Sequence, residues 1–253
     1  MRKLIAGIIL GTALLCGTKA HAQYNREYFF WVGRSCMMNN DYQEAIRTLN
    51  TLLRFDEDAF EGYFLRGIAK YNLDDLLGAD TDFSAAIVKN PVFTTAYIYR
   101  ALTRTRMGNY DDALQDFREA IDLRPDLPDA YYSRGYTRLQ NKQYEEAIED
   151  FDKFIFQENK VADAYIGRGT AYLYLKDTVR ALENFDQAIR TNRENPNGYY
   201  QRGTLLLQKE EYARAEADFD MAIRCDSNYL LSYFNRALVY NCLLYTSDAA
   251  DEL

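Results

Sequence analysis

Five arginines recur along the chain at intervals of 34 residues, and each is followed sixteen residues later by a side chain that can accept its hydrogen bonds. The pairs are Arg66 with Asp82, Arg100 with Asp116, Arg134 with Asp150, Arg168 with Asn184, and Arg202 with Asp218. A guanidinium can bind a carboxylate through two parallel hydrogen bonds. A ligand site would normally break a repeat, so we interpret this pattern as a structural ladder between helices.

Side chains suited to catalysis or metal binding are scarce. The only histidine, His21, lies in an N-terminal segment that we expect to be removed, so the commonest general base and metal ligand is missing from the rest of the chain. With Cys16 and Cys242 of the two terminal segments set aside, Cys36 and Cys225 remain, five repeats apart. At about 10 Å per repeat, their separation exceeds the ~7 Å limit for a disulfide. We therefore predict no disulfide, no metal site, no cofactor and no enzymatic activity.

The ladder belongs to a 34-residue pattern that fills residues 26–241. Its six full units are 26–59, 60–93, 94–127, 128–161, 162–195 and 196–229, and a partial seventh unit covers 230–241. One such unit could not bury its apolar face alone. An unbroken repeat of this length therefore predicts helix pairs stacked into a solenoid.

Four positions keep their character when each unit is numbered from 1 to 34. Position 20 is alanine, position 8 is glycine or alanine, position 4 is aromatic, and position 24 is leucine or phenylalanine. Small residues let helix backbones approach closely, and aromatic rings fill the space around the crossing. The prolines stand only at positions 1 and 32, where a helix start or a turn tolerates them. We expect helix A over about positions 2–14 and helix B over about positions 17–30.

This pattern resembles the tetratricopeptide repeat family, and the resemblance covers residues 26–229. It implies an all-α, right-handed superhelical solenoid of antiparallel helix pairs, whose A helices line a concave groove. Leu52 and Phe154 depart from the small residue that is usual at position 27. Phe154 either widens its helix crossing and changes the superhelical pitch there, or fits by rotation of its ring.

Positions 2, 5, 9 and 12 of helix A share one face by helical spacing, and the resemblance places this face on the groove. The predicted groove residues on or beside it are Phe64, Tyr71, Ile98, Tyr132, Tyr136, Ile166, Tyr174 and Tyr200, and the predicted rim residues are Glu61, Asp129 and Asp163. Packing of Ile98 and Ile166 against adjacent helices is an open alternative. The lysine and asparagine with which some family members hold a C-terminal carboxylate are absent from positions 5 and 9. The groove suits a protein or peptide partner with hydrophobic anchors and basic flanks.

Residues 1–22 have the features of a secretory signal peptide. A short basic start precedes an apolar run that is too short to span a membrane, and the segment ends in Ala20-His21-Ala22. We predict cleavage after Ala22 and export to the periplasm or cell envelope of a Gram-negative bacterium. A lipoprotein signal ending at Cys16 is the alternative, but the bulky Leu15 fits that processing poorly.

Residues 242–253 differ in character from the repeats. They resemble the conceptual translation of a transposase-type sequencing adapter, and the repeat pattern is lost where they begin. We expect them to be non-native and the natural chain to continue beyond Asn241. The alternative is a natural tail that does not belong to the solenoid.

Composition narrows the function. The net charge of −8 argues against nucleic acid or anionic lipid as a partner. The sequence favours a non-catalytic scaffold that binds a protein or peptide in its groove. The alternative is the N-terminal extracytoplasmic sensor region of a larger signalling or cell-envelope protein. No oligomeric state is indicated.

Overall fold

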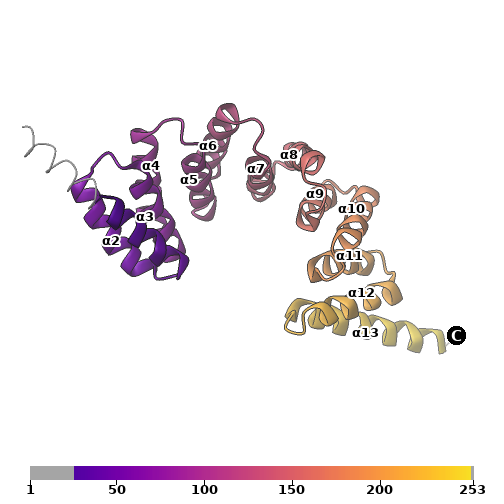
Figure 1. Cartoon of the computed structure of the whole chain (residues 1–253). Helices are drawn as coiled ribbons and strands as arrows, with labels where there is room; N and C mark the ends of the chain where they lie inside the picture. Colours follow the sequence, from indigo (N-terminus) through magenta and orange to yellow (C-terminus); the bar gives the residue numbers. More distant parts are fainter. Residues whose placement is uncertain (1–25, 252–253) are drawn as a thin grey trace, which may run out of the picture. The chain divides into compact units, whose positions relative to one another are not determined.

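The computed structural model describes the backbone of residues 26–251 and the side chains of residues 26–243. The predicted signal peptide therefore lies outside the described residues. All regular structure in residues 26–251 is helical (Figure 1). After a helix over residues 26–38, the helices are α2 (Tyr42–Phe55), α3 (Phe60–Asn72), α4 (Leu76–Lys89), α5 (Thr94–Arg106), α6 (Tyr110–Leu123), α7 (Pro128–Gln140), α8 (Tyr144–Gln157), α9 (Ala162–Tyr174), α10 (Thr178–Thr191), α11 (Pro196–Gln208), α12 (Tyr212–Cys225) and α13 (Leu230–Asp251).

From α3 onward, the A helices begin at intervals of 34 residues; those from α3 to α11 cover positions 1–13, whereas the B helices cover positions 17–30. The expected bounds of helix A were therefore wrong by one residue at each end. Pro128 and Pro196 are the first residues of α7 and α11, where the missing backbone N–H has no partner to lose. Helix α13 continues through Asn241 into the segment for which we predicted a foreign origin.

Helix A ends early because position 15 adopts the left-handed backbone conformation in all six turns between helices A and B. These residues, with φ between 59° and 80°, are Asn40, Asp74, Gly108, Lys142, Lys176 and Glu210. In repeat 5 the backbone N–H of Asp177 donates to the carbonyl oxygen of Tyr172 at 2.9 Å. The backbone N–H of Lys176 donates to the carbonyl oxygen of Leu173 at 3.0 Å. These bonds close the helix end in a Schellman motif. Only one of the six residues is a glycine.

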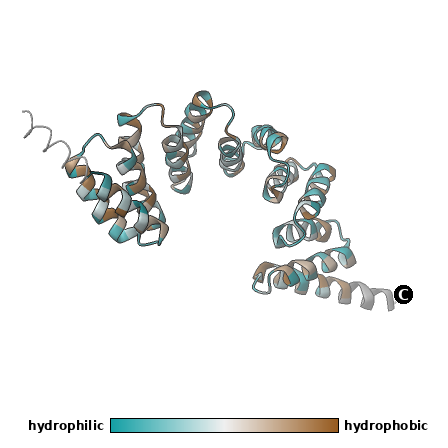
Figure 2. Cartoon of the chain, viewed as in Figure 1, coloured by the Kyte–Doolittle hydropathy of each residue, from teal (hydrophilic) through white to brown (hydrophobic). Residues whose placement is uncertain are grey.

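The core lies at the crossings of helices A and B. The alanines at position 20 and the phenylalanines at position 24 are fully buried. A Cβ atom placed on Gly67 would lie 2.7 Å from the ring of Phe83, and one on Gly169 would lie 2.7 Å from the ring of Phe185. The small residue at position 8 is therefore required by close approach of the two helices. Figure 2 shows that the helices carry both hydrophobic and hydrophilic residues, as this packing demands.

The chain divides into two compact units between Pro125 and Asp126. In the first unit, α3 packs on α4, α5 packs on α6, and the B helices α2 and α4 pack on the A helices that follow them. The second unit repeats this arrangement from α7 to α13. Each unit is therefore an all-α helical-repeat solenoid.

Phe154 is buried, and its ring centroid lies 4.8 Å from that of Tyr132. None of the helices in residues 26–251 is long and apolar enough to cross a membrane.

Candidate functional site

The repeated arginines hold helix A to helix B of their own repeat. Arg66 donates from Nε and Nη2 to the two carboxylate oxygens of Asp82, at 2.8 and 2.6 Å. The same two-bond geometry joins Arg100 to Asp116, Arg134 to Asp150, and Arg202 to Asp218. In repeat 5, Arg168 makes a single bond of 2.8 Å to the amide oxygen of Asn184. All the acceptors are buried, so these contacts are part of the scaffold.

The third donor of the arginine reaches position 25 of the preceding repeat. Nη1 of Arg66 donates to Asn50 at 2.6 Å, that of Arg100 donates to Ser84 at 2.9 Å, and that of Arg202 donates to Asp186 at 2.6 Å. The same link joins Arg168 to Asp152 and Arg236 to Asp220. One guanidinium therefore ties three helices together. Sequence analysis missed this second partner, although an acceptor at position 25 recurs with the period of the ladder.

A second cation meets the buried aspartate in three repeats. It stands at position 11, one helical turn after the arginine, and donates to the aspartate at 2.7–2.9 Å; these residues are Lys70, Arg104 and Arg138. Repeats 5 and 6 carry Tyr172 and Leu206 there instead. The spacing of four residues between positions 7 and 11 was a signal for this contact that sequence analysis missed.

The tyrosines at position 4 support the ladder arginines. In repeats 2 to 5 and in the partial seventh repeat, the guanidinium carbon lies 5.4–5.7 Å from the ring centroid of the tyrosine three residues earlier. This is the geometry of a cation–π contact. Position 4 therefore fixes the arginine as well as filling space.

Several predicted groove residues take part in packing. Ile98 and Ile166 are each only 8% exposed, in agreement with the alternative that the sequence left open. The ring of Phe64 lies 4.9 Å from that of Phe93 and 5.3 Å from that of Tyr99. Tyr200 contacts the rings of Phe219 and Tyr229. We use the term A-helix face for positions 2, 5, 9, 12 and 13 of the A helices.

Tyr132 and Tyr136 form a cluster on this face. Their ring centroids lie 5.0 Å apart, and Tyr136 also packs edge to face on Phe151 at 5.1 Å. The hydroxyl of Tyr136 donates to the backbone carbonyl of Asp163 at 2.7 Å, which links repeats 4 and 5. Burial raises the pKa of both tyrosine hydroxyls. Tyr136 is therefore committed to the scaffold.

Tyr71 and Tyr174 are held on one side and partly open to solvent. The guanidinium of Arg106 lies 4.6 Å from the ring centroid of Tyr71 and is anchored to Asp74 at 2.7 Å. Tyr174 is 60% exposed and stacks on Tyr144, with ring centroids 4.8 Å apart and an interplanar angle of 9°. Both rings are pre-positioned without being enclosed.

The predicted rim residues differ in their surroundings. Asp163 accepts a hydrogen bond from Asn195 at 2.8 Å, in addition to the bond to its backbone carbonyl. Asp129 is exposed in the first turn of α7. Glu61 lines a pocket of about 270 Å³ between repeats 1 and 2. Asp163 is therefore a structural residue, whereas Glu61 stands at a hollow on the A-helix face.

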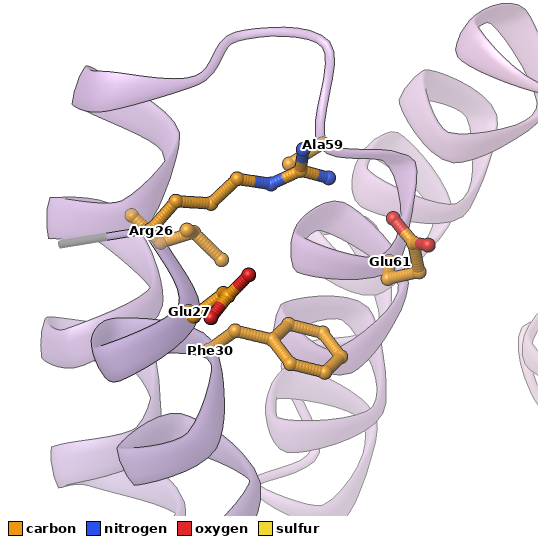
Figure 3. A pocket seen from close by; sticks show the side chains of 6 residues that line it. Arg26, Glu27, Phe30, Ala59 and Glu61 are labelled. Carbon is orange, nitrogen blue, oxygen red and sulfur yellow. The ribbon is translucent and has the colours of Figure 1, made fainter. Parts of the chain in front are cut away.

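The pocket is lined by residues of repeat 1 and by one residue of repeat 2: Arg26, Glu27, Phe30, Leu52 and Ala59, and Glu61. Figure 3 shows Arg26, Glu27 and Phe30 on one side of the pocket, with Ala59 and Glu61 across from them. Nε of Arg26 lies 2.9 Å from a carboxylate oxygen of Asp56. Among the side chains of residues 26–243, no three of histidine, cysteine, aspartate or glutamate gather in a way that could hold a metal ion.

The fold and the repeated contacts define a helical-repeat protein of interacting helix pairs. Two family models match the chain: one described as TPR repeat over residues 101–142, and one described as Tetratricopeptide repeat over residues 166–229. The chain therefore carries tetratricopeptide repeats over residues 101–142 and 166–229.

Solved structures have the same fold. A tetratricopeptide repeat protein from Parabacteroides merdae is 20% identical with a TM-score of 0.65, and the match covers 85% of this chain and 84% of that one. PilF of Pseudomonas aeruginosa is 16% identical with a TM-score of 0.71, covering 86% and 99%. YrrB, described as a TPR protein with an unusual peptide-binding site, is 16% identical with a TM-score of 0.58, covering 75% and 97%. At these identities the likeness shows the fold alone. No curated protein sequence matches the chain.

Proposed function

We propose that this chain is a non-catalytic scaffold that binds peptide segments of partner proteins on its A-helix face. The observation that carries the proposal is that Tyr71 and Tyr174 offer partly open rings which Arg106 and Tyr144 hold in place. Immobilised aromatic rings bind apolar side chains with little further loss of conformational entropy. The peptide-binding site named for YrrB supports this use of the fold.

The test uses an array of decapeptides with randomised Leu, Phe, Tyr, Lys and Asp positions, probed with the full chain. Tyr71→Ala and Tyr174→Ala each remove one open ring. We expect each to lower the signal of the bound peptides about fivefold to tenfold, as loss of an aromatic anchor does. Phe156→Ala is the matched control, because Phe156 is 91% exposed but belongs to helix B of repeat 4.

Unchanged binding by both tyrosine variants would reject the A-helix face as the binding surface. An array on which the unmodified chain binds no peptide would reject the scaffold function. Tyr132→Ala and Tyr136→Ala are poor tests of binding. They remove ring contacts to Phe151, and the Tyr136 variant also loses the hydrogen bond to Asp163.

The proposal includes export of the protein. Sequencing the N-terminus of the protein produced in a Gram-negative host tests it directly. We expect the mature chain to begin at Gln23 and to be released with the periplasmic fraction. An N-terminus at Met1 in the cytoplasmic fraction would contradict export.

A further inference from the structure

Helix α13 is packed on one face and open on another. Val239 is fully buried in a cluster with Phe219 of α12. Ala237, by contrast, is exposed, although the small residue at position 8 is buried in all six earlier repeats. We use the term open face of α13 for the residues at positions 4, 5, 7, 8 and 11 of the seventh repeat: Tyr233, Phe234, Arg236, Ala237 and Tyr240. Its three aromatic side chains are 39–64% exposed.

In repeats 2 to 6, helix B of the same repeat covers the equivalent positions. The small residue at position 8 lies against the phenylalanine at position 24, as Gly67 lies against Phe83. In repeat 2 the ring at position 5 contacts the same phenylalanine, and the centroids of Phe64 and Phe83 lie 5.8 Å apart. The arginine at position 7 binds the aspartate or asparagine at position 23. These contacts show what kind of helix fits the open face.

Arg236 keeps one hydrogen bond of the ladder and lacks the others. Its Nη1 donates to Asp220 at 2.6 Å, and its guanidinium carbon lies 5.4 Å from the ring centroid of Tyr233. Among the described side chains its Nε and Nη2 have no acceptor, whereas both atoms bind the position-23 aspartate in repeats 2, 3, 4 and 6. Carboxylates further along the chain begin at Asp248, twelve residues or about 18 Å along α13. Residues 1–25 have no acidic side chain. The open face therefore presents two unused donors beside an apolar surface.

We infer that the open face of α13 binds an amphipathic helix of a partner protein, in the place that helix B takes in the other repeats. The partner helix carries an alanine, an aspartate three residues later and a phenylalanine directly after the aspartate, as α6 does. The phenylalanine packs on Ala237 and Phe234, and the aspartate accepts two hydrogen bonds from Arg236. This interface goes beyond the peptide binding of the proposed function.

The helix comes from another protein, because the described part of this chain has none to offer. All six turns between helices A and B have a left-handed residue at position 15, but α13 continues as a helix past that position to Asp251. The chain therefore does not turn back onto the open face. The residues at position 24 of its own B helices are fully buried, so a second copy could supply such a helix only by unfolding a repeat.

The test is a titration of the ¹⁵N-labelled full chain with a capped peptide that has the sequence of α6, residues 110–123. We expect the backbone amide resonance of Ala237 and the Nε–H resonance of Arg236 to shift on binding. Phe117→Ala in the peptide should weaken binding at least about tenfold, since it removes the aromatic anchor. Asp116→Asn in the peptide should weaken binding about fivefold, since it removes the charge and one acceptor.

Ala237→Leu in the chain is the decisive variant. Because Ala237 is exposed, leucine is accommodated in α13 and adds apolar surface. A close helix crossing has no room for leucine at position 8, so we expect the peptide to bind at least about tenfold more weakly. Ala217→Leu is the matched control, because it makes the same change at an exposed position of α12.

Unchanged or stronger binding to the Ala237→Leu chain would overturn the inference, because it would indicate unspecific association of apolar surfaces. No binding, or equal binding of the parent and Phe117→Ala peptides, would overturn it as well. A dimer of the unmodified chain that Ala237→Leu dissociates, measured by light scattering, would assign the open face to a second copy. A source gene in which a seventh helix B follows Asn241 would assign it to this chain. Either result would reject the partner protein.

Discussion

Repeats 3 and 5 build the same pair of helices from different residues at three positions that matter. Helix A has 13 residues and helix B has 14 residues in both repeats. At positions 8, 15 and 23, repeat 3 has Ala101, Gly108 and Asp116, whereas repeat 5 has Gly169, Lys176 and Asn184. The comparison teaches that the fold requires close approach of helices A and B, a left-handed residue in the turn between them, and hydrogen-bond acceptors for the ladder arginine. Each of these requirements can be met by more than one residue type.

The charges around the ladder show this most clearly. In repeat 3, Asp116 accepts bonds from both Arg100 and Arg104. In repeat 5, position 11 is Tyr172, position 23 is the neutral Asn184, and the negative charge comes from Asp152 of the preceding helix B. In repeat 5 the missing cation therefore accompanies a missing anion, whereas repeat 6 keeps Asp218 although Leu206 stands at position 11. Buried charges are costly when unpaired, so the two losses compensate each other.

The largest expected effect comes from Asp116→Asn, which gives repeat 3 the amide of repeat 5 without the other changes. Arg100 would then lose one of its two bonds to this side chain, Arg104 would keep Asp80 as a partner at 2.7 Å, and an amide N–H would face a guanidinium. We expect a loss of about 3 kcal/mol in the free energy of unfolding, typical of breaking a buried ion pair. Urea denaturation followed by circular dichroism measures it.

Two further variants sharpen this prediction. Adding Arg104→Tyr to Asp116→Asn reproduces the combination found in repeat 5 and should recover part of the lost stability. Asn184→Asp should change stability by less than about 1 kcal/mol, because Arg168 already has Asp152 as a partner. A double variant that is less stable than the sum of its two single losses would contradict compensation.

The next effect concerns the crossing at position 8. Gly169→Ala would place a methyl group 2.7 Å from the ring of Phe185 and 3.0 Å from Cβ of Asn184. Phe185 is fully buried, so a shift of its ring would disturb the side chains packed around it. We expect a net loss of about 2 kcal/mol from overpacking, although alanine is the better helix former. The free energy of unfolding from urea denaturation checks this.

Repeat 3 supplies the control for the crossing, because Ala101 is accommodated there without exposure. Ala101→Gly should cost about 1 kcal/mol, the difference in helix propensity alone. Stabilisation by Gly169→Ala would show that the two crossings are equivalent and that glycine is not required in repeat 5.

Much of the scaffold could be predicted because it repeats. The spacing of Arg66 and Asp82 recurs in the units that follow, and the period places both residues on helices that must cross. The left-handed turn could not be read from composition, since Lys142 and Lys176 are ordinary helix formers. Their conformation is imposed by the hydrogen bonds that close helix A.

The A-helix face was harder to predict, because a tyrosine looks the same in a sequence whether it is free or engaged. Tyr136 and Tyr174 were both predicted to line the groove. The hydroxyl of Tyr136 donates to a backbone carbonyl 27 residues further along the chain, whereas Tyr174 keeps most of its ring in solvent. That difference depends on how successive repeats stack. Helical spacing within one repeat does not contain it.

The smallest expected effect tests the turn at position 15, where Gly108 and Lys176 have φ of 80° and 62°. No atom lies within 4 Å of a Cβ placed on Gly108, so Gly108→Ala introduces backbone strain without a clash. We expect it to lower the free energy of unfolding by about 1 kcal/mol, and Lys176→Gly to raise it by somewhat less. Opposite signs in urea denaturation would show that both turns share one strained conformation and that repeat 5 tolerates the strain. If Lys176→Gly lowered the stability, the added flexibility of the unfolded chain would outweigh the relief of strain, and the lysine would be the better residue for this turn.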